Sequence, residues 1–418
     1  MSFLYTAFVY SYGLAIRLVS LFNAKAALWI KGRRNWHTIL VSKREKGAKY
    51  IWVHCASLGE FEQGRPVIEK FKNEYPGYRI ALTFFSPSGY EIRKNYELAD
   101  IISYLPLDTP SNAASFVSAL QPEMAIFVKY EFWYHHLKAI HDRHIPLFLI
   151  SAHFKPGQVF FSWYGRFFRK TLSFFSYIFV QEEQSKKLLA TIGVNNVAIA
   201  GDTRFDRVFE IKQKIKELPF FRELRSGLRV LVAGSTWPPD EELLLKFIKQ
   251  NPHIKCVIAP HEIGELHVKA IIRQGEELGL SLKRYSEVNA REAAVIIIDS
   301  IGLLSSLYAY ADIAYIGGGF GKGIHNVLEA AVYEIPVFFG PHYERFNEAV
   351  QLVKRGGAGV VKSLDDLGEI NALLNNAKAL EETGTVIKDF MQESRGATER
   401  IFQYLKPLLK GIDVKAKL

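Results

Sequence analysis

Short apolar runs alternate with longer amphipathic stretches along most of this chain, and this alternation limits the possible folds more than any other feature. In the first half, runs with the character of buried strands occur at 50–53, 79–83, 101–104, 124–127, 147–150, 177–180 and 197–200. Helical patterns lie between most of them, and Pro or Gly marks many of the joins. A repeated strand–helix order predicts a parallel sheet that is covered by helices on both faces.

A second series of the same kind follows a charged segment, residues 211–228, which is rich in Lys and Glu. Its strand-like runs lie at 229–233, 255–259, 295–298, 313–316, 336–339 and 359–361. A chain of 418 residues is also too long for one ordinary core. We therefore predict an α/β protein with two domains, residues 31–210 and 211–418. Ligands are expected in a cleft between the carboxyl ends of their strands.

The N-terminus differs from the rest of the chain. Residues 3–22, FLYTAFVYSYGLAIRLVSLF, carry a single charge, Arg17, and as a helix they just span the hydrocarbon core of a bilayer. No basic start and no small-residue cleavage site precede the body, so a cleaved signal peptide is not expected. Basic residues follow, which by the positive-inside bias keep the body cytoplasmic. We predict a membrane-anchor helix within residues 1–30, either spanning or lying on the membrane, with a buried core helix as the alternative.

The overall charge indicates which partners suit the chain, and the cysteines indicate the redox state of its compartment. The net charge of +10 suits anionic partners, namely nucleic acid, anionic membrane or phosphorylated substrates. No recognised nucleic-acid motif accompanies that charge, so no nucleic-acid partner is expected. The two cysteines, Cys55 and Cys256, lie in separate predicted strands, which indicates reduced core thiols. No cluster of metal-ligating residues is visible, so we expect no metal.

The segment IWVHCASLGE, residues 51–60, is the most informative motif. A strand runs through small residues into a helix start, and open α/β sheets bind their ligands at this kind of turn. Glu60 is therefore a candidate general base, although position alone favours an ordinary helix-capping Glu. Glu131 follows another predicted strand at the same edge, and Arg204 ends the first domain, where it suits a phosphate or carboxylate. Their alternatives are a capping Glu and a surface Arg in a salt bridge.

Residues 317–349 of the second half, GGGFGKGIHNVLEAAVYEIPVFFGPHYERFNEA, combine a glycine-rich loop with a predicted helix from about residue 324. Glycines let the backbone approach a phosphate, and helix N-termini supply amide donors. Asn326 and Glu329 share a face and suit hydrogen bonds to a base and to ribose hydroxyls. The spacing matches neither a dinucleotide fingerprint nor a P-loop. We favour a donor-nucleotide site over a plain glycine-rich turn.

Three further strand ends of the second half carry polar groups. Ser235 and Thr236 can bind a phosphate or cap a helix, and His261 after Pro260 can contact a nucleotide or lie on the surface. Asp299 is as well suited to capping as to ligand binding. Each signal is weak alone, and their shared location at one predicted sheet edge is the argument.

Together these motifs resemble those of the 3-deoxy-D-manno-octulosonic acid (Kdo) transferases of lipopolysaccharide synthesis. The resemblance extends from the apolar N-terminal segment to about residue 408. Its strongest parts are HCASLGE near residue 60, GSTWPPDEE near 235, and GIHNVLEAA followed by GPHYERFNEA, and YEFW near 131 is a looser match.

The resemblance implies a GT-B fold of two Rossmann-like domains facing a cleft. The acceptor site would lie in the first domain and the CMP-sugar site in the second. It implies transfer of Kdo from CMP-Kdo to the anionic tetraacyl lipid A precursor, without an obligatory metal or cofactor. The location implied is the cytoplasmic face of the inner membrane, in contact with its lipids.

The resemblance also implies roles for individual residues. Glu60 matches the family's general base, and Glu131 and Arg204 match positions that support the transition state. The residues that match CMP contacts are Pro260, His261, Ile301, Gly302, Leu303, Asn326, Val327, Leu328 and Glu329.

The chain departs from the family pattern at several of these positions. The family often has Pro-Arg-His where this chain has Pro260-His261-Glu262, which puts a phosphate contact at His261 in doubt. It usually has Lys in place of Arg204, and often an acid in place of Leu303. GIHN also stands where the family often has GGHN.

The chemistry fits the resemblance independently. A carboxylate such as Glu60 can take the proton of an attacking hydroxyl, and direct attack predicts inversion at the anomeric carbon. The departing negative charge would be stabilised by Arg204, backbone amides and Ser235. Basic residues at 25–44, and Arg166, Arg169 and Lys170 among aromatic residues, suit an anionic lipid. For the second cluster, a solvated basic face on a core helix is an equal alternative. The alternatives are another GT-B enzyme that uses a UDP-sugar, or a membrane-bound nucleotide- or lipid-binding protein without catalysis.

Overall fold

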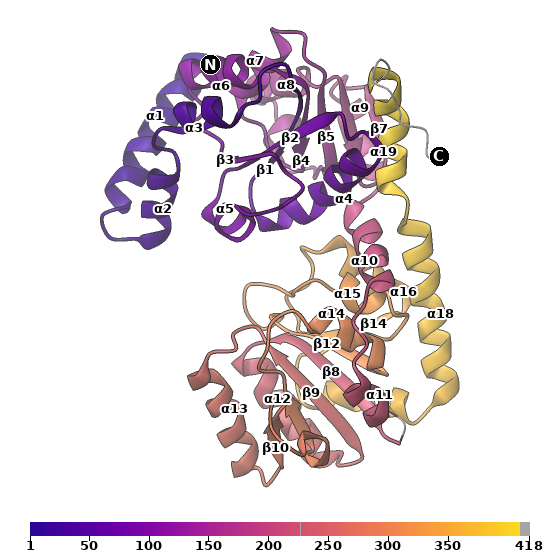
Figure 1. Ribbon diagram of the computed structural model, residues 1–418. Coiled ribbons are helices and arrows are strands. Elements are labelled where there is room, and N and C mark those ends of the chain that lie inside the picture. The colour runs from indigo at the N-terminus through magenta and orange to yellow at the C-terminus, as the bar shows by residue number, and fades with distance from the viewer. Residues whose placement is uncertain (226, 410–418) are drawn as a thin grey trace. The chain divides into compact units, whose positions relative to one another are not determined.

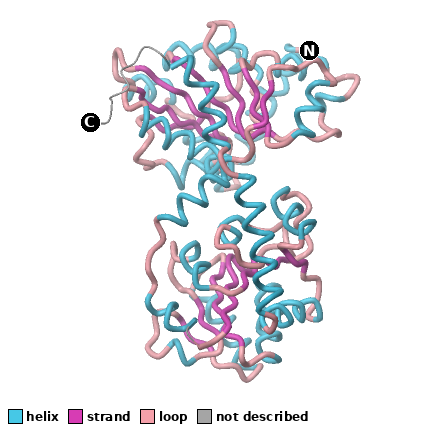
Figure 2. Tube along the Cα trace, turned by 90° about the vertical axis from the view of Figure 1, so that its right-hand side faces the viewer, coloured by secondary structure: helices cyan, strands magenta, loops and turns pink. Residues whose placement is uncertain are grey.

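The computed structural model of the protein describes residues 1–225 and 227–409. The chain forms two compact units (Figures 1 and 2). Unit 1 comprises Met1–Arg207 and the segment that starts at Arg395, and unit 2 comprises Val208–Ser394. Each unit holds one seven-stranded sheet in which every pairing is parallel, so the predicted α/β fold with two parallel sheets is confirmed.

The sheet of unit 1 has the strand order β3-β2-β1-β4-β5-β6-β7. Its strands are β1 (Lys49–Cys55), β2 (Tyr78–Phe84), β3 (Ile101–Tyr104), β4 (Pro122–Val128), β5 (Leu147–Ala152), β6 (Tyr177–Val180) and β7 (Val197–Ile199). Each of the seven strands predicted in this half overlaps one of them. The chain first adds strands on one side of β1 and then continues with β4 on its other side. The carboxyl ends of β1 and β4 therefore flank the point where the strand order reverses, which is where open α/β sheets bind ligands.

Helices cover both faces of this sheet. They are α1 (Ser2–Val19), α2 (Ala24–Gly32), α3 (Trp36–Lys43), α4 (Leu58–Glu74), α5 (Pro87–Arg93), α6 (Pro110–Leu120), α7 (Tyr134–His141), α8 (Arg166–Leu172), α9 (Glu183–Ala190) and α19 (Ala397–Leu405). Along β1, Ile51 and Val53 belong to one buried cluster, with side chains of α4, whereas Tyr50 and Trp52 belong to another, with side chains of α6 and α7. Successive strand residues point to opposite faces, so unbroken apolar runs require this double cover.

Unit 2 repeats the plan with the order β10-β11-β9-β8-β12-β13-β14. Its strands are β8 (Arg229–Thr236), β9 (Ile254–Pro260), β10 (Leu282–Arg284), β11 (Val295–Ile297), β12 (Ile313–Ile316), β13 (Val337–Phe339) and β14 (Ala358–Val360). Here β8 lies between β9 and β12, so the strand order reverses between β8 and β12. The short edge strand β10 was not predicted, because three half-buried residues leave little apolar signal.

The helices of unit 2 include one correction to the sequence prediction. They are α11 (Pro219–Arg225), α12 (Pro238–Gln250), α13 (Glu265–Glu277), α14 (Leu304–Leu307), α15 (Leu328–Ala331), α16 (Asn347–Arg355), α17 (Gly368–Leu374) and α18 (Ala377–Ser394), and α10 (Thr203–Gln213) runs from unit 1 into unit 2. Short 3₁₀ turns lie at Val159–Phe161, Ala290–Glu292, Tyr308–Tyr310, Asp365–Leu367 and Lys406–Leu409. The helix predicted from about residue 324 begins only at Leu328.

The C-terminal helix returns to unit 1, whereas the sequence prediction assigned all of residues 211–418 to the second domain. Ile401, Phe402 and Leu405 of α19 are fully buried in the same cluster as Phe71 of α4, and the rings of Phe71 and Phe402 lie 4.7 Å apart. The apolar stripe of α19 was visible in the sequence. The two sheets are similar, and α19 covers the one with an open apolar face. The spacing of residues in the sequence does not reveal which sheet that is.

Polar capping reinforces this return. Asp206, in the first turns of α10, accepts hydrogen bonds from the backbone N–H groups of Gly396 (2.6 Å) and Thr398 (2.7 Å). These N–H groups lie at the start of α19 and have no partner within that helix. The carboxylate therefore ties the returning segment to the end of unit 1.

Helix α1 packs along unit 1 through one stripe and exposes apolar side chains elsewhere. It is the one helix among residues 1–225 and 227–409 that is long and apolar enough to cross a membrane, judged by length and composition alone. Val9 and Gly13 are buried, and a Cβ atom on Gly13 would lie 2.7 Å from Leu107. Phe8 and Leu14, by contrast, are mostly exposed. The helix is thus neither a core helix nor detached from the domain.

A buried carboxylate holds α1 in place. Asp108 accepts hydrogen bonds from the Tyr5 hydroxyl (2.6 Å), from the backbone N–H groups of His135 and His136, and from His136 Nδ1 (2.6 Å). Burial by itself would raise the pKa of Asp108, but the hydrogen bonds and charge of His136, with the bond from Tyr5, outweigh it and hold the pKa below its usual value. The ionised form is therefore the one that the fold requires.

We predict that Asp108→Asn destabilises unit 1 by about 3 kcal/mol, because buried donors lose their charged acceptor. Five of the six tryptophans, all except Trp237, lie in unit 1, so tryptophan fluorescence during urea unfolding reports mainly on this unit. The control is Asp142→Asn, which removes an exposed partner of Lys138 and should cost under about 0.5 kcal/mol. Because the folded pKa is depressed, this stabilisation is present above the unfolded pKa of about 4 and is lost as the pH falls below it. Equal losses in the two variants would contradict this account.

Candidate active site

Glu60 lies in the first turn of α4, directly after β1, and is half-buried. The Ser57 hydroxyl, at the N-cap position of α4, donates to Glu60 Oε2. The other oxygen, Oε1, receives no hydrogen bond from the residues that the structure describes. Glu60 does not cap the backbone of its own helix, so its carboxylate is held through one oxygen and presents the other. This geometry suits a proton acceptor better than a simple capping residue.

Glu131 follows β4 and is only 8% exposed. Its Oε2 accepts hydrogen bonds from Trp133 Nε1 (2.5 Å) and His54 Nε2 (3.1 Å). Within the described part of the chain, its Oε1 has no protein donor. Glu131 is therefore oriented as firmly as Glu60 and likewise leaves one oxygen open.

The two carboxylates share the carboxyl edge at the reversal of strand order, because β1 and β4 are neighbours. Glu131 contacts His54 of β1, and Glu60 lies in the helix turn directly after β1. Burial raises the pKa of the Cys55 thiol at the end of β1, and the charges of Glu60 and Glu131 raise it further. Burial and then Glu60 likewise raise the pKa of Tyr130 to about 12. The structure thus brings together the two acids that the sequence predicted at one edge. Their catalytic roles remain predictions.

Arg204 belongs to unit 1, but it is engaged by a neighbour that the sequence analysis did not use. Its Nε and Nη2 donate to Asp202 Oδ2 at 3.0 and 2.7 Å, and its backbone N–H donates to Oδ1. Gln63 and Gln181 also donate to Asp202. Burial would raise the pKa of Asp202, whereas Arg204 outweighs it and lowers the pKa. The spacing of Asp202 and Arg204 was the available signal, because an Asp two residues before an Arg can accept hydrogen bonds from both the backbone N–H and the guanidinium group of that Arg.

In unit 2, Ser235 and Thr236 at the end of β8 have different environments. Thr236 is fully buried, and its hydroxyl donates to Glu241 Oε1 (2.9 Å), which His267 also contacts. The predicted phosphate contact by the Thr236 side chain is therefore not supported, because the hydroxyl is used inside the unit. Ser235 is half-buried with a φ of +54°, and its hydroxyl makes no hydrogen bond with the described residues. Of the two, Ser235 has the hydroxyl for which the predicted phosphate contact stays a prediction.

Three rings form a stack at the ends of β8 and β9. The ring of His261 lies 4.7 Å from Trp237 and 4.5 Å from His325, tilted by 25° and 26°. Trp237 Nε1 donates to His325 Nε2 at 3.2 Å, so the proton of neutral His325 resides on Nδ1. Burial, and secondarily His261, lower the pKa of His325 to about 4. His325 is therefore a neutral N–H donor at pH 7. Trp237 lies within the GSTWPPDEE motif, but the sequence analysis gave it no role in the site.

The glycine-rich loop after β12 packs against the ends of the neighbouring strands. Gly317 N–H donates to Gly234 O (2.9 Å), and a Cβ atom on Gly317 would lie 2.3 Å from Ser235 O. A Cβ atom on Gly319 would lie 2.6 Å from the backbone of Gly340, after β13. The backbone therefore approaches itself too closely for side chains at these positions. The predicted convergence of these loops on one edge is confirmed.

Residues 326–329 divide between ligand-facing and core positions. Val327 and Leu328 are fully buried, so their side chains belong to the core, and the predicted CMP contacts stay a prediction for their backbone groups. Asn326 Nδ2 donates to Glu329 Oε1 (3.0 Å), and Asn326 Oδ1 accepts from the Leu328 N–H group. Both Asn326 and Glu329 are half-buried and remain candidates for base and ribose contacts.

The remaining predicted residues lie at the carboxyl ends of β9 and β11. Pro260, the last residue of β9, is buried, whereas His261 is exposed. Ile301 is 87% exposed, Gly302 has a φ of +87°, and Leu303 is half-buried before α14. Ile301 and Gly302 therefore lie in an exposed turn after β11.

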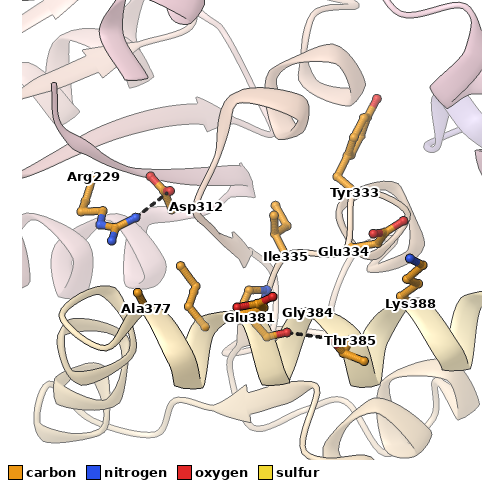
Figure 3. A pocket seen from close by; sticks show the side chains of 12 residues that line it. Arg229, Asp312, Tyr333, Glu334, Ile335, Ala377, Glu381, Gly384, Thr385 and Lys388 are labelled. Atoms are coloured by element: carbon orange, nitrogen blue, oxygen red, sulfur yellow. Dashed lines mark hydrogen bonds and ion pairs between the residues drawn. The ribbon is translucent and has the colours of Figure 1, made fainter. Parts of the chain in front are cut away.

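A pocket of unit 2 lies at the opposite edge of the sheet, beside α18 (Figure 3). Its lining includes Arg229 and Asp312, which form an ion pair at 3.3 Å, together with Glu334 and Lys388. These residues lie near the amino ends of β8, β12 and β13, away from the glycine-rich loop. The pocket is thus separate from the predicted site. In the part of the chain that the structure describes, no group of three His, Cys, Asp or Glu residues is placed to hold a metal ion.

Solved structures show the fold of this chain. A UDP-GlcNAc 2-epimerase from Neisseria meningitidis, bound to UDP-GlcNAc, matches with a TM-score of 0.60 at 16% identity, covering 86% of this chain and 100% of that one. The UDP-GlcNAc 2-epimerase of Methanocaldococcus jannaschii matches with a TM-score of 0.54 at 14% identity, covering 86% and 99%. At such identities the likeness concerns the fold alone, and it confirms the predicted GT-B type of architecture.

Sequence comparisons bear on the family. Residues 32–207 match the family model for 3-deoxy-D-manno-octulosonic-acid transferase (kdotransferase). The 3-deoxy-D-manno-octulosonic acid transferase of Haemophilus influenzae is 28% identical over 375 residues, covering 86% of this chain and 87% of the relative. That of Aquifex aeolicus is 29% identical over 376 residues, covering 88% and 96%. The resemblance predicted from the motifs is therefore confirmed: over most of its length this chain is similar to the 3-deoxy-D-manno-octulosonic acid transferases, and its residues 32–207 match the model of that family.

Proposed function

We propose that this protein is a glycosyltransferase that moves Kdo from CMP-Kdo to the tetraacyl lipid A precursor, in lipopolysaccharide synthesis. The observation that carries the proposal is the pair of oriented carboxylates, Glu60 and Glu131, at the strand-order reversal of unit 1. The similarity of this chain to Kdo transferases over most of its length supports the proposed class of substrate. The acceptor belongs to unit 1 in this proposal, and the donor to unit 2.

The proposed reaction is a direct displacement. Glu60 Oε1 takes the proton of an acceptor hydroxyl while the oxygen of that hydroxyl forms a bond to the anomeric carbon of Kdo. The bond from that carbon to the phosphate oxygen of CMP breaks, and CMP leaves with the electron pair. Attack opposite the leaving group inverts the anomeric configuration. Glu131 and Arg204, each fixed by buried partners, stabilise the charges that develop.

The donor would bind at the carboxyl edge of unit 2. The Ser235 hydroxyl suits the phosphate of CMP, whereas several backbone amides of the glycine-rich loop, including those of Gly317 and Gly318, already donate within unit 2. Neutral His325 offers an Nδ1–H donor, and Asn326 with Glu329 suits the cytosine and ribose. We propose no metal or other cofactor for this step.

Membrane association is proposed for α1. Its exposed apolar side chains include Phe3, Phe8, Leu14 and Leu18, and Phe22 just beyond it is 92% exposed. Because Tyr5 and Gly13 are docked on unit 1, we propose that the helix lies in the membrane interface instead of crossing the bilayer. This would place the enzyme on the cytoplasmic face of the inner membrane, next to its lipid acceptor.

The central prediction compares transfer by wild type and Glu60→Gln, using enzymatically generated CMP-Kdo and a tetraacylated, bisphosphorylated disaccharide lipid. Loss of the base should lower kcat by about 10²- to 10⁴-fold. Glu62→Gln is the matched control, because Glu62 lies on the same helix but pairs with Arg93 (2.9 Å). Absence of transfer by folded wild type would refute the substrate pair and direct attention to UDP-sugars. Transfer that survives in Glu60→Gln would remove Glu60 as the base.

A second prediction concerns the donor site. A Cβ atom on Gly340 would lie 2.7 Å from the backbone carbon of Gly319, so Gly340→Ala should separate the two loops and weaken CMP binding about tenfold or more. Isothermal titration of CMP measures this, and UDP serves as the competing nucleotide. Gly264→Ala is the control, because its Cβ atom would meet open space. Unchanged CMP affinity in Gly340→Ala would place the nucleotide elsewhere.

A third prediction tests the membrane surface. Leu14→Asp puts a charge on the exposed apolar side of α1 and should weaken binding to anionic phospholipid vesicles about tenfold. Ser11→Asp adds the same charge at an exposed polar position and should change binding much less. Vesicle flotation of the full chain measures both. If the two variants bind equally well, the exposed side of α1 is not the membrane contact.

A further inference from the structure

A buried chain of hydrogen bonds ends on Glu131. Trp52 Nε1 and Thr83 Oγ1 are 2.8 Å apart, Thr83 Oγ1 and His54 Nδ1 are 2.8 Å apart, and His54 Nε2 and Glu131 Oε2 are 3.1 Å apart. We call Trp52, Thr83, His54 and Glu131 the His54 relay. Trp52 and His54 project from the same face of β1, and Thr83 is the register partner of His54 on β2. The relay is thus built into the pairing of two strands.

The direction of the donors follows from the chemistry of each group. The indole N–H of Trp52 only donates, so Thr83 Oγ1 accepts it. The Thr83 hydroxyl proton is then available for His54 Nδ1, its remaining neighbour in the relay. A neutral imidazole that accepts at Nδ1 carries its proton on Nε2 and donates it to Glu131. One consistent order of donors therefore runs from Trp52 to the carboxylate.

Burial shows what this arrangement accomplishes. Trp52 and His54 are fully buried and Thr83 is 1% exposed, whereas Glu131 is the member that reaches the surface of unit 1. Trp133 donates to the same oxygen, Oε2, so both donors fix one side of the carboxylate. Oε1 is left without a donor from the described residues, on the edge shared with Glu60. A core that needed only packing would be served equally well by apolar residues.

We propose that His54, with its tautomer set by Thr83, is a positioning residue that orients Glu131 so that Oε1 faces the substrate. The proposal rests on the proposed transfer reaction for its kinetic consequence, whereas the tautomer belongs to the protein alone. His54 does not touch substrate in this proposal. Its effect on turnover passes through Glu131.

The kinetic test is a double-mutant cycle in the full chain. Thr83→Val is isosteric and removes the hydroxyl, and it should lower kcat about tenfold or more while KM for both substrates changes less than about twofold. Thr83→Ser keeps the hydroxyl and should restore kcat to within about twofold of wild type. In a Glu131→Gln background, Thr83→Val should cause no further loss, because the two act as one unit. Equal losses in both backgrounds would overturn the proposal, as would unchanged kcat in Thr83→Val.

A control variant and a spectrum separate positioning from simple destabilisation. Thr171→Val removes another buried hydroxyl of unit 1, which donates to Phe168 O (2.6 Å), and should leave kcat unchanged. In ¹⁵N-histidine spectra, His54, identified by its absence in His54→Gln, should carry its proton on Nε2 in wild type. A proton on Nδ1 would overturn the proposal whether or not transfer is observed. Absence of transfer by wild type with the expected tautomer would instead count against the proposed function.

Discussion

The pairing of β1 with β4 is the interaction on which the rest of unit 1 depends. In a parallel sheet all strands end at the same edge, and β1 has β2 on one side and β4 on the other. The chain passes from β1 to β2 on one side and from β4 to β5 on the other, and open α/β sheets bind ligands at such a reversal of strand order. Glu60 follows one strand and Glu131 the other. Strand order, and not closeness in sequence, thus brings the two carboxylates together.

Buried polar groups then fix the orientation of the site side chains. Asp202 gathers Gln63, Gln181 and Arg204, and His54 and Trp133 hold one oxygen of Glu131. The hydrogen bonds to these carboxylates limit their freedom to rotate, although Gln63 Oε1 is buried without a partner in the described part of the chain. Unit 2 follows the same logic with backbone groups, where glycines bring the loops after β8, β12 and β13 into close contact. A site with little freedom to rearrange suits a reaction that depends on precise placement of a hydroxyl and a leaving group.

The sequence was most informative where a signal is local. Apolar runs located thirteen of the fourteen strands found in residues 1–225 and 227–409, and small residues before Glu60 marked the turn at the carboxyl edge of the sheet. It was least informative where a side chain has two possible surroundings. Val327 and Leu328 fall within a matching motif yet face the core, and the Thr236 hydroxyl is used by Glu241. Adjacent residues of one motif point in different directions, and a motif alone does not say which of them faces the ligand.

The sequence by itself determined the α/β class, the two sheets, the edge on which candidate groups gather and the resemblance to Kdo transferases. These follow from periodicity, turn chemistry and the residues of a few short motifs. Only the tertiary structure decided that α19 returns to unit 1, that α1 is docked through Tyr5, and that His54 lies between Thr83 and Glu131. The physical reason is common to all three. Each depends on contacts between segments far apart in the chain, and sequence spacing does not show which of those segments pair or pack together.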